Sequence, residues 1–482
     1  MENNNESSLK ISKKSFFSSM FILLLLMIGA GILTLVVPSG AFERIMVDGK
    51  EVIVPGTFQF AQTGNYPFWR WFTAPVEVLW SADSVTVIMI IVFICIIGGT
   101  FTVLDKSGML QYIMNGLVKK FETSKYKLMA VLTLFFMLFG SIFGIFEELV
   151  ALVPIVILLS HAMGWDSLVG LGMSLISIAW GFTAATFNPF NVVTVQKLAG
   201  LEIFSGLWLR LIVFVGVYLI FFLFLYLYAR KIEKNPTKSP VFESDKALRE
   251  KYNLSDADVV LADKNIQKGT KAFLTCILID MCFIILDFIL GAGGVLSLPA
   301  MAILFTTGGF LAGYFTNLRG KSLLKSFFQG AKSIAPAIPL IIFVVAISYV
   351  LSEGKIMHTI LYELYELMKG LSPSVAILLL FGVIALLEFF IGSGTAKAFL
   401  IMPLVAPLSD LVGITRQSVV TTFCMADGFT NLLYPTSGIM IIAIGLVGVS
   451  YGKWIKWSSK LFIGEFIFSA AIMLLMVAIN YH

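Results

Sequence analysis

Long apolar runs recur along the whole chain, and they constrain its fold more than any other feature. A run of about 18 apolar residues is long enough to cross the hydrocarbon core of a bilayer as a helix. Charged residues make up only 13% of the 482 residues, against about a quarter in a soluble domain. We therefore expect a helical, multi-pass membrane protein, because a membrane β-barrel shows a weaker, alternating pattern.

Composition and charge exclude several classes of protein. Soluble enzymes, secreted disulfide scaffolds and nucleic-acid binders do not carry apolar runs of this kind. The net charge of +5 arises in loops beside the predicted spans, where the positive-inside rule places it, so no nucleic-acid partner is expected. All four cysteines lie in apolar segments without metal-ligand spacing, and we expect neither a metal site nor a cofactor.

Two of the apolar stretches, 128–163 and 375–411, are too long for single crossings and are interrupted midway by small or charged residues. Re-entrant helical hairpins fit this pattern. About nine transmembrane spans account for the other runs, and two of these, 168–199 and 417–449, are themselves interrupted. The predicted order is a cytoplasmic N-terminus (1–15), a first membrane repeat (16–231), a cytoplasmic linker (232–270), an extra span (271–292) and a second membrane repeat (293–482).

Charge also predicts the orientation. Ten Lys and Arg residues lie between Arg230 and Lys271, which places this linker in the cytoplasm. If either long stretch were a single crossing, the basic loop after it would lie outside. We therefore predict a bacterial cytoplasmic membrane protein with a cytoplasmic N-terminus.

The two halves of the chain repeat each other. Pro154 and Pro403 lie 249 residues apart, and each follows a glycine-bearing interruption, GSIFGIFEE (140–148) in the first half and IGSGTAK (391–397) in the second. Further on, GFTAATFNPFN (181–191) matches DGFTNLLYPTSG (427–438). Because the predicted topology inserts these elements in opposite orientations, they form an inverted repeat, which is typical of secondary transporters.

The interruptions predict four half-helices that begin near mid-membrane, at about Phe146, Thr395, Pro189 and Pro435. Their positive dipole ends favour an anionic group such as a carboxylate, and the freed carbonyls favour a cation. An alternative is that the broken helices only permit tight packing, but four matched breaks in one inverted repeat make this explanation weaker.

These paired segments resemble the YfcC/ArcD basic amino-acid antiporter family, which is grouped with the anaerobic C4-dicarboxylate carriers in the ion-transporter superfamily. The resemblance extends from about Lys13 to Trp457. It implies two inverted repeats with scaffold and transport parts, an elevator-like mechanism, often a homodimer, and arginine/ornithine exchange as one activity of the family.

Ionisable residues within predicted spans need a reason, because each is costly in a bilayer. Glu147 and Glu148 lie at the first tip, Lys397 at the matching position of the second, Asp427 before the second broken span, and Glu388 one turn before the second tip. A structural Glu148–Lys397 pair is one interpretation. It leaves carboxylates in excess, and this excess favours a ligand with a cationic side chain.

The predicted binding site has two ends. The substrate's guanidinium or ammonium would meet Glu147, Glu148 or Asp427, and Lys397 would stand where related carriers hold a sodium ion. The α-carboxylate would bind the half-helix N-termini and the polar side chains of Thr183, Thr186, Asn188, Ser393, Thr395, Asn431, Thr436 and Ser437.

Other functions fit the sequence less well. A membrane enzyme would need a nucleophile–base pair or metal ligands at depth, and a channel would not need two re-entrant hairpins. Among transporters, the alternative is a proton- or sodium-coupled carrier for C4-dicarboxylates or other small carboxylates. Such a carrier should show surplus Lys and Arg at the tips, whereas this sequence has surplus Glu and Asp. The sequence therefore predicts a basic amino-acid antiporter.

Overall fold

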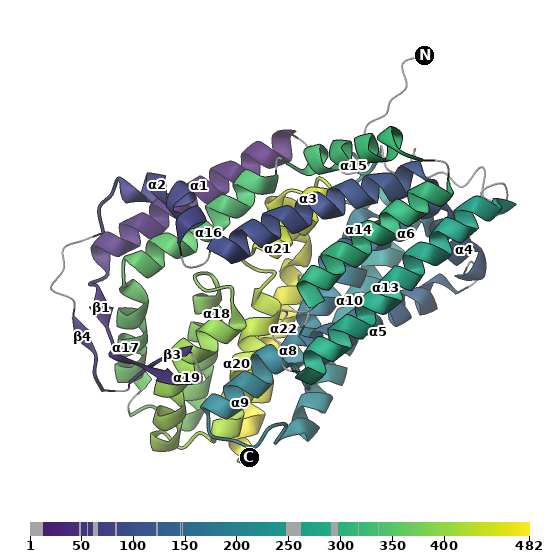
Figure 1. Cartoon of the computed structure of the whole chain (residues 1–482). Helices are drawn as coiled ribbons and strands as arrows, with labels where there is room; N and C mark the ends of the chain where they lie inside the picture. Colours follow the sequence, from purple (N-terminus) through teal and green to yellow (C-terminus); the bar gives the residue numbers. More distant parts are fainter. Residues whose placement is uncertain are drawn as a thin grey trace.

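The protein is described by a computed structural model in which almost every element is a helix (Figure 1). The described residues are 13–47, 50–54, 56–60, 66–81, 84–121, 124–144, 146, 148–246, 262–290, 297–316, 318–335, 337–368 and 370–482.

The first half of the chain contains long helices separated by short helical turns. Their bounds are α1 (Lys13–Val36), α2 (Arg70–Glu77), η1 (Val78–Trp80), α3 (Ser84–Lys106), α4 (Met109–Phe121), α5 (Lys125–Phe143), η2 (Glu148–Leu152), α6 (Val153–Ala162), α7 (Ser167–Leu171), η3 (Gly172–Ile176), α8 (Ser177–Ala184), η4 (Pro189–Val193), α9 (Thr194–Leu198) and α10 (Leu207–Lys234). The turns η1 and η2 are 3-10 helices, and η3 and η4 are π-helices.

The second half of the chain is also almost entirely helical. Its elements are η5 (Pro236–Lys238), α13 (Lys264–Leu290), α14 (Ser297–Phe315), α15 (Lys321–Ile334), α16 (Ala337–Glu353), α17 (Ile356–Met368), α18 (Pro373–Glu388), α19 (Gly394–Leu411), α20 (Arg416–Thr430), α21 (Gly438–Leu446) and α22 (Tyr451–Ala478).

Four short strands follow α1. Strand β1 (Gly40–Ala41) pairs antiparallel with β4 (Gln59–Phe60), and β2 (Arg44–Val47) pairs antiparallel with β3 (Lys50–Ile53), with Arg44 opposite Ile53 and Val47 opposite Lys50. These small ladders lie between α1 and α2.

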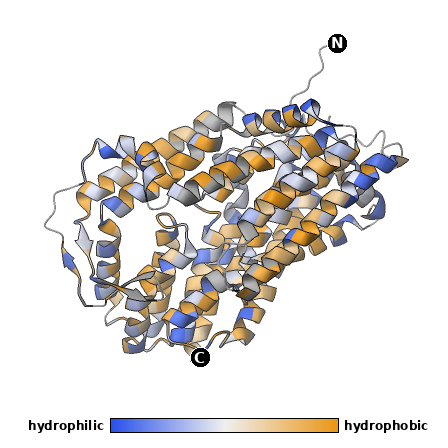
Figure 2. Cartoon of the chain, viewed as in Figure 1, coloured by the Kyte–Doolittle hydropathy of each residue, from blue (hydrophilic) through white to orange (hydrophobic). Residues whose placement is uncertain are grey.

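Length and apolar composition qualify four described segments to cross a membrane: Lys125–Phe143, Ser167–Ala184, Leu207–Lys234 and Tyr451–Ala478. A fifth candidate is the pair formed by α16 and α17, which are bent by 66° relative to each other. Figure 2 shows hydrophobic residues along most helices and hydrophilic ones mainly near their ends. The architecture is that of an all-α membrane protein, and nine spans remain a prediction.

Elements that correspond in the predicted repeat have similar lengths and similar packing partners. Helices α4 and α17 each contain 13 residues, and α10 and α22 each contain 28. Helix α1 packs against α16 of the other half, and the corresponding α14 packs against α3. In the same way α2 packs against α16 and α15 against α3. Two helices of each half therefore pack against one helix of the other half: α1 and α2 against α16, and α14 and α15 against α3.

The two halves also meet at the centre, where α8 contacts α20. All residues of α20 from Gln417 to Thr430 are buried. A Cβ atom on Gly428 would lie 2.1 Å from the backbone N of Thr183, so the two helices touch backbone to backbone. Glycine permits this close approach, and it positions the ends of both helices next to one another.

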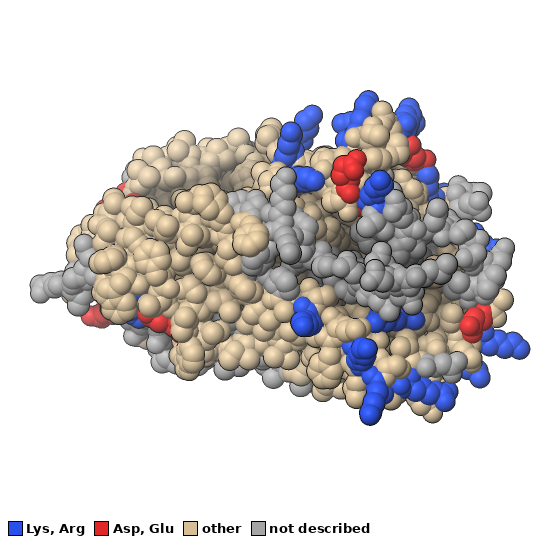
Figure 3. All heavy atoms as spheres, turned by 90° about the horizontal axis from the view of Figure 1, so that it is seen from above, with Lys and Arg blue, Asp and Glu red and all other residues tan. Residues whose placement is uncertain are grey.

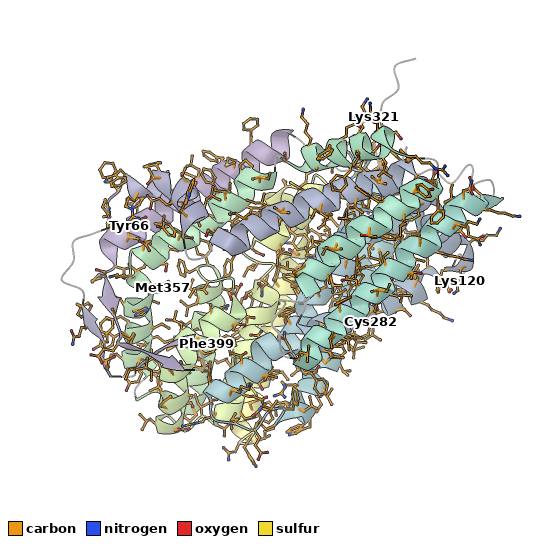
Figure 4. All side chains as sticks on the ribbon, in the orientation of Figure 1. Tyr66, Lys120, Cys282, Lys321, Met357 and Phe399 are labelled. Atoms are coloured by element: carbon orange, nitrogen blue, oxygen red, sulfur yellow. The ribbon has the colours of Figure 1, made fainter. Side chains whose placement is uncertain are left out.

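Basic residues gather toward one end of the molecule. Figure 3, a view from above, shows Lys and Arg concentrated over one half of that face. Figure 4 labels Lys321, which begins α15, and Lys120 near the end of α4, on the same side of the molecule. This asymmetry is the pattern expected for the cytoplasmic end of a membrane protein.

Candidate functional site

The loop between α18 and α19 is the second interruption identified in the sequence. Helix α18 ends at Glu388 and α19 begins at Gly394. Ser393 caps α19, because its Oγ accepts a hydrogen bond from the Ala396 backbone N at 3.3 Å. The loop residues Gly392 and Ser393 are exposed, whereas Glu388 is buried. A buried carboxyl therefore lies beside an exposed loop and a capped helix N-terminus.

Lys397, in the first turns of α19, bridges two carboxylates. Its Nζ donates to Asp427 Oδ1 of α20 at 2.7 Å and also to Glu388 Oε2. The side chain of Lys397 is 0% exposed and those of Glu388 and Asp427 are each 2% exposed. Removing three charges from water is costly, and mutual hydrogen bonding offsets that cost. With all three ionised, two negative charges and one positive charge leave a net charge of −1.

Asn191 of η4 brings the first half of the chain into this site. Its Nδ2 donates to Asp427 Oδ2 at 2.6 Å. A Cβ atom on Gly394 would lie 2.9 Å from both Asn191 Oδ1 and Asp427 Oδ2, so a side chain there would displace these groups. We call Glu388, Lys397, Asp427 and Asn191 the Lys397 cluster; it joins α18, α19, α20 and η4.

The break between α8 and η4 is closed by Ser141 of α5. Ala185 adopts a left-handed conformation with φ of 37°, which ends α8. The backbone N–H groups of Phe187 and Asn188 donate to the Ser141 carbonyl O at 3.1 Å, and that of Thr186 donates to Ser141 Oγ at 3.1 Å. Backbone donors freed by this break are therefore satisfied within the protein.

The break between α20 and α21 is closed mainly by α22. Trp454 Nε1 donates to the Leu432 carbonyl O at 3.0 Å, and Tyr451 OH donates to the Leu433 carbonyl O at 2.9 Å. Ser437 caps α21 by accepting from the Met440 backbone N at 3.4 Å. The backbone groups named here are bonded within the protein, so the alternative interpretation, in which the breaks only permit tight packing, is sufficient to explain them.

Several predicted site residues lie at or next to the Lys397 cluster. Lys397 and Asp427 belong to it, and Asn431 Nδ2 donates to the Asp427 carbonyl O at 2.8 Å. Thr395 lies between the Ser393 cap and Lys397 on α19 and is half-buried. Ser393 and Ser437 are helix caps, as described above.

Other predicted site residues have local roles in this conformation. Thr183 Oγ1 donates to the Ala179 carbonyl O of its own helix at 3.2 Å, and Thr186 Oγ1 pairs with Ser141 Oγ at 3.0 Å. Asn188 Oδ1 accepts from the Asn191 backbone N at 3.1 Å. Thr436 is buried, and its Oγ1 makes no hydrogen bond with any described residue.

The first tip is described only in part. Glu147 lies outside the described residues, and Glu148 begins η2 with a side chain that is not described. The predicted Glu148–Lys397 pair therefore remains a prediction. The described partners of Lys397 are Glu388 and Asp427.

The sequence-based site omitted Asn191, Ser141 and Glu388. Asn191 is the second asparagine of the NPFN segment, one turn after Asn188, and Ser141 follows the first glycine of GSIFG. Glu388 was noted as an intramembrane charge, but not assigned to the ligand. Among the described residues, no group of three or more His, Cys, Asp or Glu side chains is placed to hold a metal ion.

Residues 16–478 match the family described as C4-dicarboxylate anaerobic carrier (DcuC). The chain belongs to this family. It is 31% identical to the "Putative basic amino acid antiporter YfcC" of Escherichia coli (strain K12), with 93% of this chain and 94% of that protein covered. It is 26% identical to an uncharacterized protein of Haemophilus influenzae, with 85% and 78% covered. The family resemblance expected from the motifs is thereby confirmed, and the chain is a multi-pass membrane transporter.

Two solved structures are similar to the whole chain at low identity. The Alcanivorax borkumensis YdaH transporter gives a TM-score of 0.42 at 15% identity, with 97% of this chain and 98% of that chain covered. Neisseria gonorrhoeae MtrF gives a TM-score of 0.40 at 16% identity, with 95% and 93% covered.

Proposed function

We propose that this DcuC-family transporter exchanges basic amino acids of the arginine/ornithine type across the bacterial cytoplasmic membrane. The proposal includes a cytoplasmic N-terminus, re-entrant hairpins formed by α5–α6 and α18–α19, an elevator-like alternating-access movement and a homodimer. The name of the E. coli relative supports the substrate class.

The observation that carries the proposal is the net charge of the Lys397 cluster. Glu388 and Asp427 together outweigh Lys397 by one negative charge in a site whose charged side chains are at most 2% exposed. Electrostatic interactions are strong where water is excluded. A substrate with a net charge of +1, such as arginine, ornithine or lysine, would make the loaded cluster neutral.

The cationic end and the carboxylate end of the substrate would use different parts of the site. In the described conformation Asp427 is already engaged by Lys397 and Asn191. A bound guanidinium or ammonium would therefore share these carboxylates with Lys397. The α-carboxylate would lie at the N-termini of α19 and α21, which Ser393 and Ser437 cap and where helix dipoles favour an anion.

A carrier for C4-dicarboxylates, coupled to protons or sodium, is the second candidate, and the family description favours it. A dicarboxylate would bring two negative charges next to a cluster that already has a surplus of one. The charge balance of the described cluster therefore supports a cationic substrate over a dianionic one.

A thermal-shift screen of the purified protein tests the substrate class. Arginine, ornithine and lysine should raise the melting temperature, since a ligand at 100 times its dissociation constant stabilises by about 2.7 kcal/mol. Citrulline, which lacks the charge, serves as the matched ligand control. Stabilisation by succinate or fumarate without any effect of the basic amino acids would contradict the proposal.

A further inference from the structure

The unloaded Lys397 cluster has an unbalanced charge. Glu388, Lys397 and Asp427 are paired with each other, and with all three ionised one negative charge remains uncompensated. A buried charge without a counter-charge costs several kcal/mol. Either a bound cation or a proton on one carboxyl would remove this cost, and the empty carrier has no bound cation.

We propose that Glu388 is a proton-binding site that is occupied when the cationic substrate leaves and vacated when it binds. This inference rests on the proposed function. A proton passes from water to the Glu388 carboxylate as the substrate cation departs, and returns to water as the next cation arrives. In each alternating-access movement the site is then neutral, because it holds either one substrate cation or one proton.

Hydrogen bonding indicates which of the two carboxyls accepts the proton. Asp427 accepts hydrogen bonds at both oxygens, from Lys397 at 2.7 Å and from Asn191 at 2.6 Å. Glu388 accepts a hydrogen bond from Lys397, and its other close polar neighbour is the Asp427 carboxyl, which is a donor only when one of the two carboxyls is protonated. Donors stabilise the ionised form of a carboxyl, so Glu388, which has fewer donors, is the carboxyl that we assign to the proton.

The surroundings of Glu388 contain few other charges. Helix α18 packs against α17, α20 and α22. The titratable or charged groups on these helices are His358, Tyr362, Glu363, Tyr365 and Glu366 of α17, Arg416, Cys424 and Asp427 of α20, and Tyr451, Lys453, Lys456, Lys460 and Glu465 of α22. The described groups that interact electrostatically with the Glu388 carboxyl are Lys397, Asp427 and, in the α20–α21 loop, Tyr434.

Glu388 also lies close to the exposed loop. A Cβ atom on Gly392 would lie 3.9 Å from Glu388 Oε1, and Gly392 itself is exposed. The proton-binding oxygen therefore lies directly beneath the loop between α18 and α19. By contrast, Glu465 of α22 is fully buried, and neither of its carboxyl oxygens has a hydrogen-bond partner among the described residues. Glu465 provides a matched control.

The test measures arginine binding and proton release by the full-length protein in weakly buffered detergent solution. The wild type should release up to one proton per arginine bound, and its affinity should fall by about tenfold per pH unit on the acidic side of the Glu388 titration, as expected for competition between two ligands. Glu388→Gln, which removes the surplus charge, should bind arginine more weakly, without proton release and independently of pH. Glu465→Gln should behave as the wild type.

Further variants distinguish a proton site from a structural role. Glu388→Asp retains a carboxyl and should restore proton release, even if Glu388→Gln is unstable. Proton release that persists unchanged in Glu388→Gln, or that disappears in Glu465→Gln, would overturn the inference. Arginine binding by the wild type without proton release would also overturn it, while leaving the proposed function intact. Binding of succinate in place of arginine would instead overturn the proposed function.

Discussion

Lys397 Nζ lies 2.7 Å from Asp427 Oδ1, and the same ammonium is hydrogen-bonded to Glu388. This contact joins the loop-flanking helices α18 and α19 to the centre of the molecule. It also neutralises one of the two carboxylate charges in the absence of a ligand. An unloaded site therefore carries one surplus negative charge, where the sequence alone predicted a larger excess.

The Lys397–Asp427 pair should show strong energetic coupling. Lys397→Met and Asp427→Asn should each lower the melting temperature, because removing one partner of a buried pair costs about 3–5 kcal/mol. The double variant should be less destabilised than the sum of the single variants, with a coupling energy of about 0.5–3 kcal/mol. Strictly additive melting shifts would mean that the contact does not stabilise the protein.

Close backbone contact at the crossing of α8 and α20 predicts a severe effect of Gly428→Ala. The new Cβ would lie 2.1 Å from the Thr183 backbone N, so the two helices would have to separate. Gly382→Ala on α18 is the matched control, because its Cβ would meet no atom within 4 Å. We expect a large loss of melting temperature for Gly428→Ala and an unchanged or slightly raised one for Gly382→Ala, since alanine favours helix by about 0.5–1 kcal/mol.

The Arg70–Glu77 pair on α2 predicts a pH effect on stability. Arg70 Nη2 and Glu77 Oε2 are 2.5 Å apart, and this hydrogen bond holds the pKa of Glu77 below its ordinary value of 4.5. A carboxyl whose pKa is lowered on folding stabilises the protein above its unfolded pKa, and this contribution is lost as the pH falls through the folded pKa.

Melting curves between neutral pH and pH about 3 test this effect. Glu77→Gln should lower stability at neutral pH and should differ less from the wild type at the acidic end. Because Glu77 is 23% exposed, the difference should be modest. A difference that grows with acidification would contradict the assignment.

Membrane orientation can be tested by cysteine labelling in a background without the four native cysteines. Thr237→Cys, at an exposed position in η5, should be protected from an impermeant thiol reagent in whole cells. Glu43→Cys, exposed between β1 and β2, should react. The opposite pattern would reverse the proposed orientation.

Sequence patterns predicted the helix ends correctly where a residue type has a single structural effect, such as ending or capping a helix. The glycines, prolines and small polar residues of the interruptions mark the ends of α18 and α20 and the starts of α19 and α21, because such residues favour helix ends and caps. The family resemblance and the α-helical membrane class followed from the same motifs and from the apolar runs.

Side-chain partners were harder to predict, because they depend on how distant segments pack. A Glu148–Lys397 pair was one interpretation of the sequence and remains a prediction; the described contacts of Lys397, Glu388 nine residues earlier and Asp427 on another helix, were not predicted. Asn191 could not be assigned to Asp427, 236 residues away, without the contact between the halves. Hydropathy identifies candidate membrane spans, but it does not determine which polar side chains are in contact with each other.

Exchange of cationic amino acids by reconstituted protein tests the central claim most directly. At a pH alkaline enough to keep Glu388 ionised in the empty carrier, the substrate neutralises the surplus negative charge of the Lys397 cluster, so the loaded carrier should cross faster than the empty one. Proteoliposomes preloaded with ornithine, at the same alkaline pH on both sides and without a sodium gradient, should take up labelled arginine much faster than unloaded ones. Unlabelled lysine should compete, and Asp427→Asn should weaken uptake of arginine. Equal uptake by unloaded vesicles, or competition by succinate and fumarate but not by lysine and ornithine, would contradict the account.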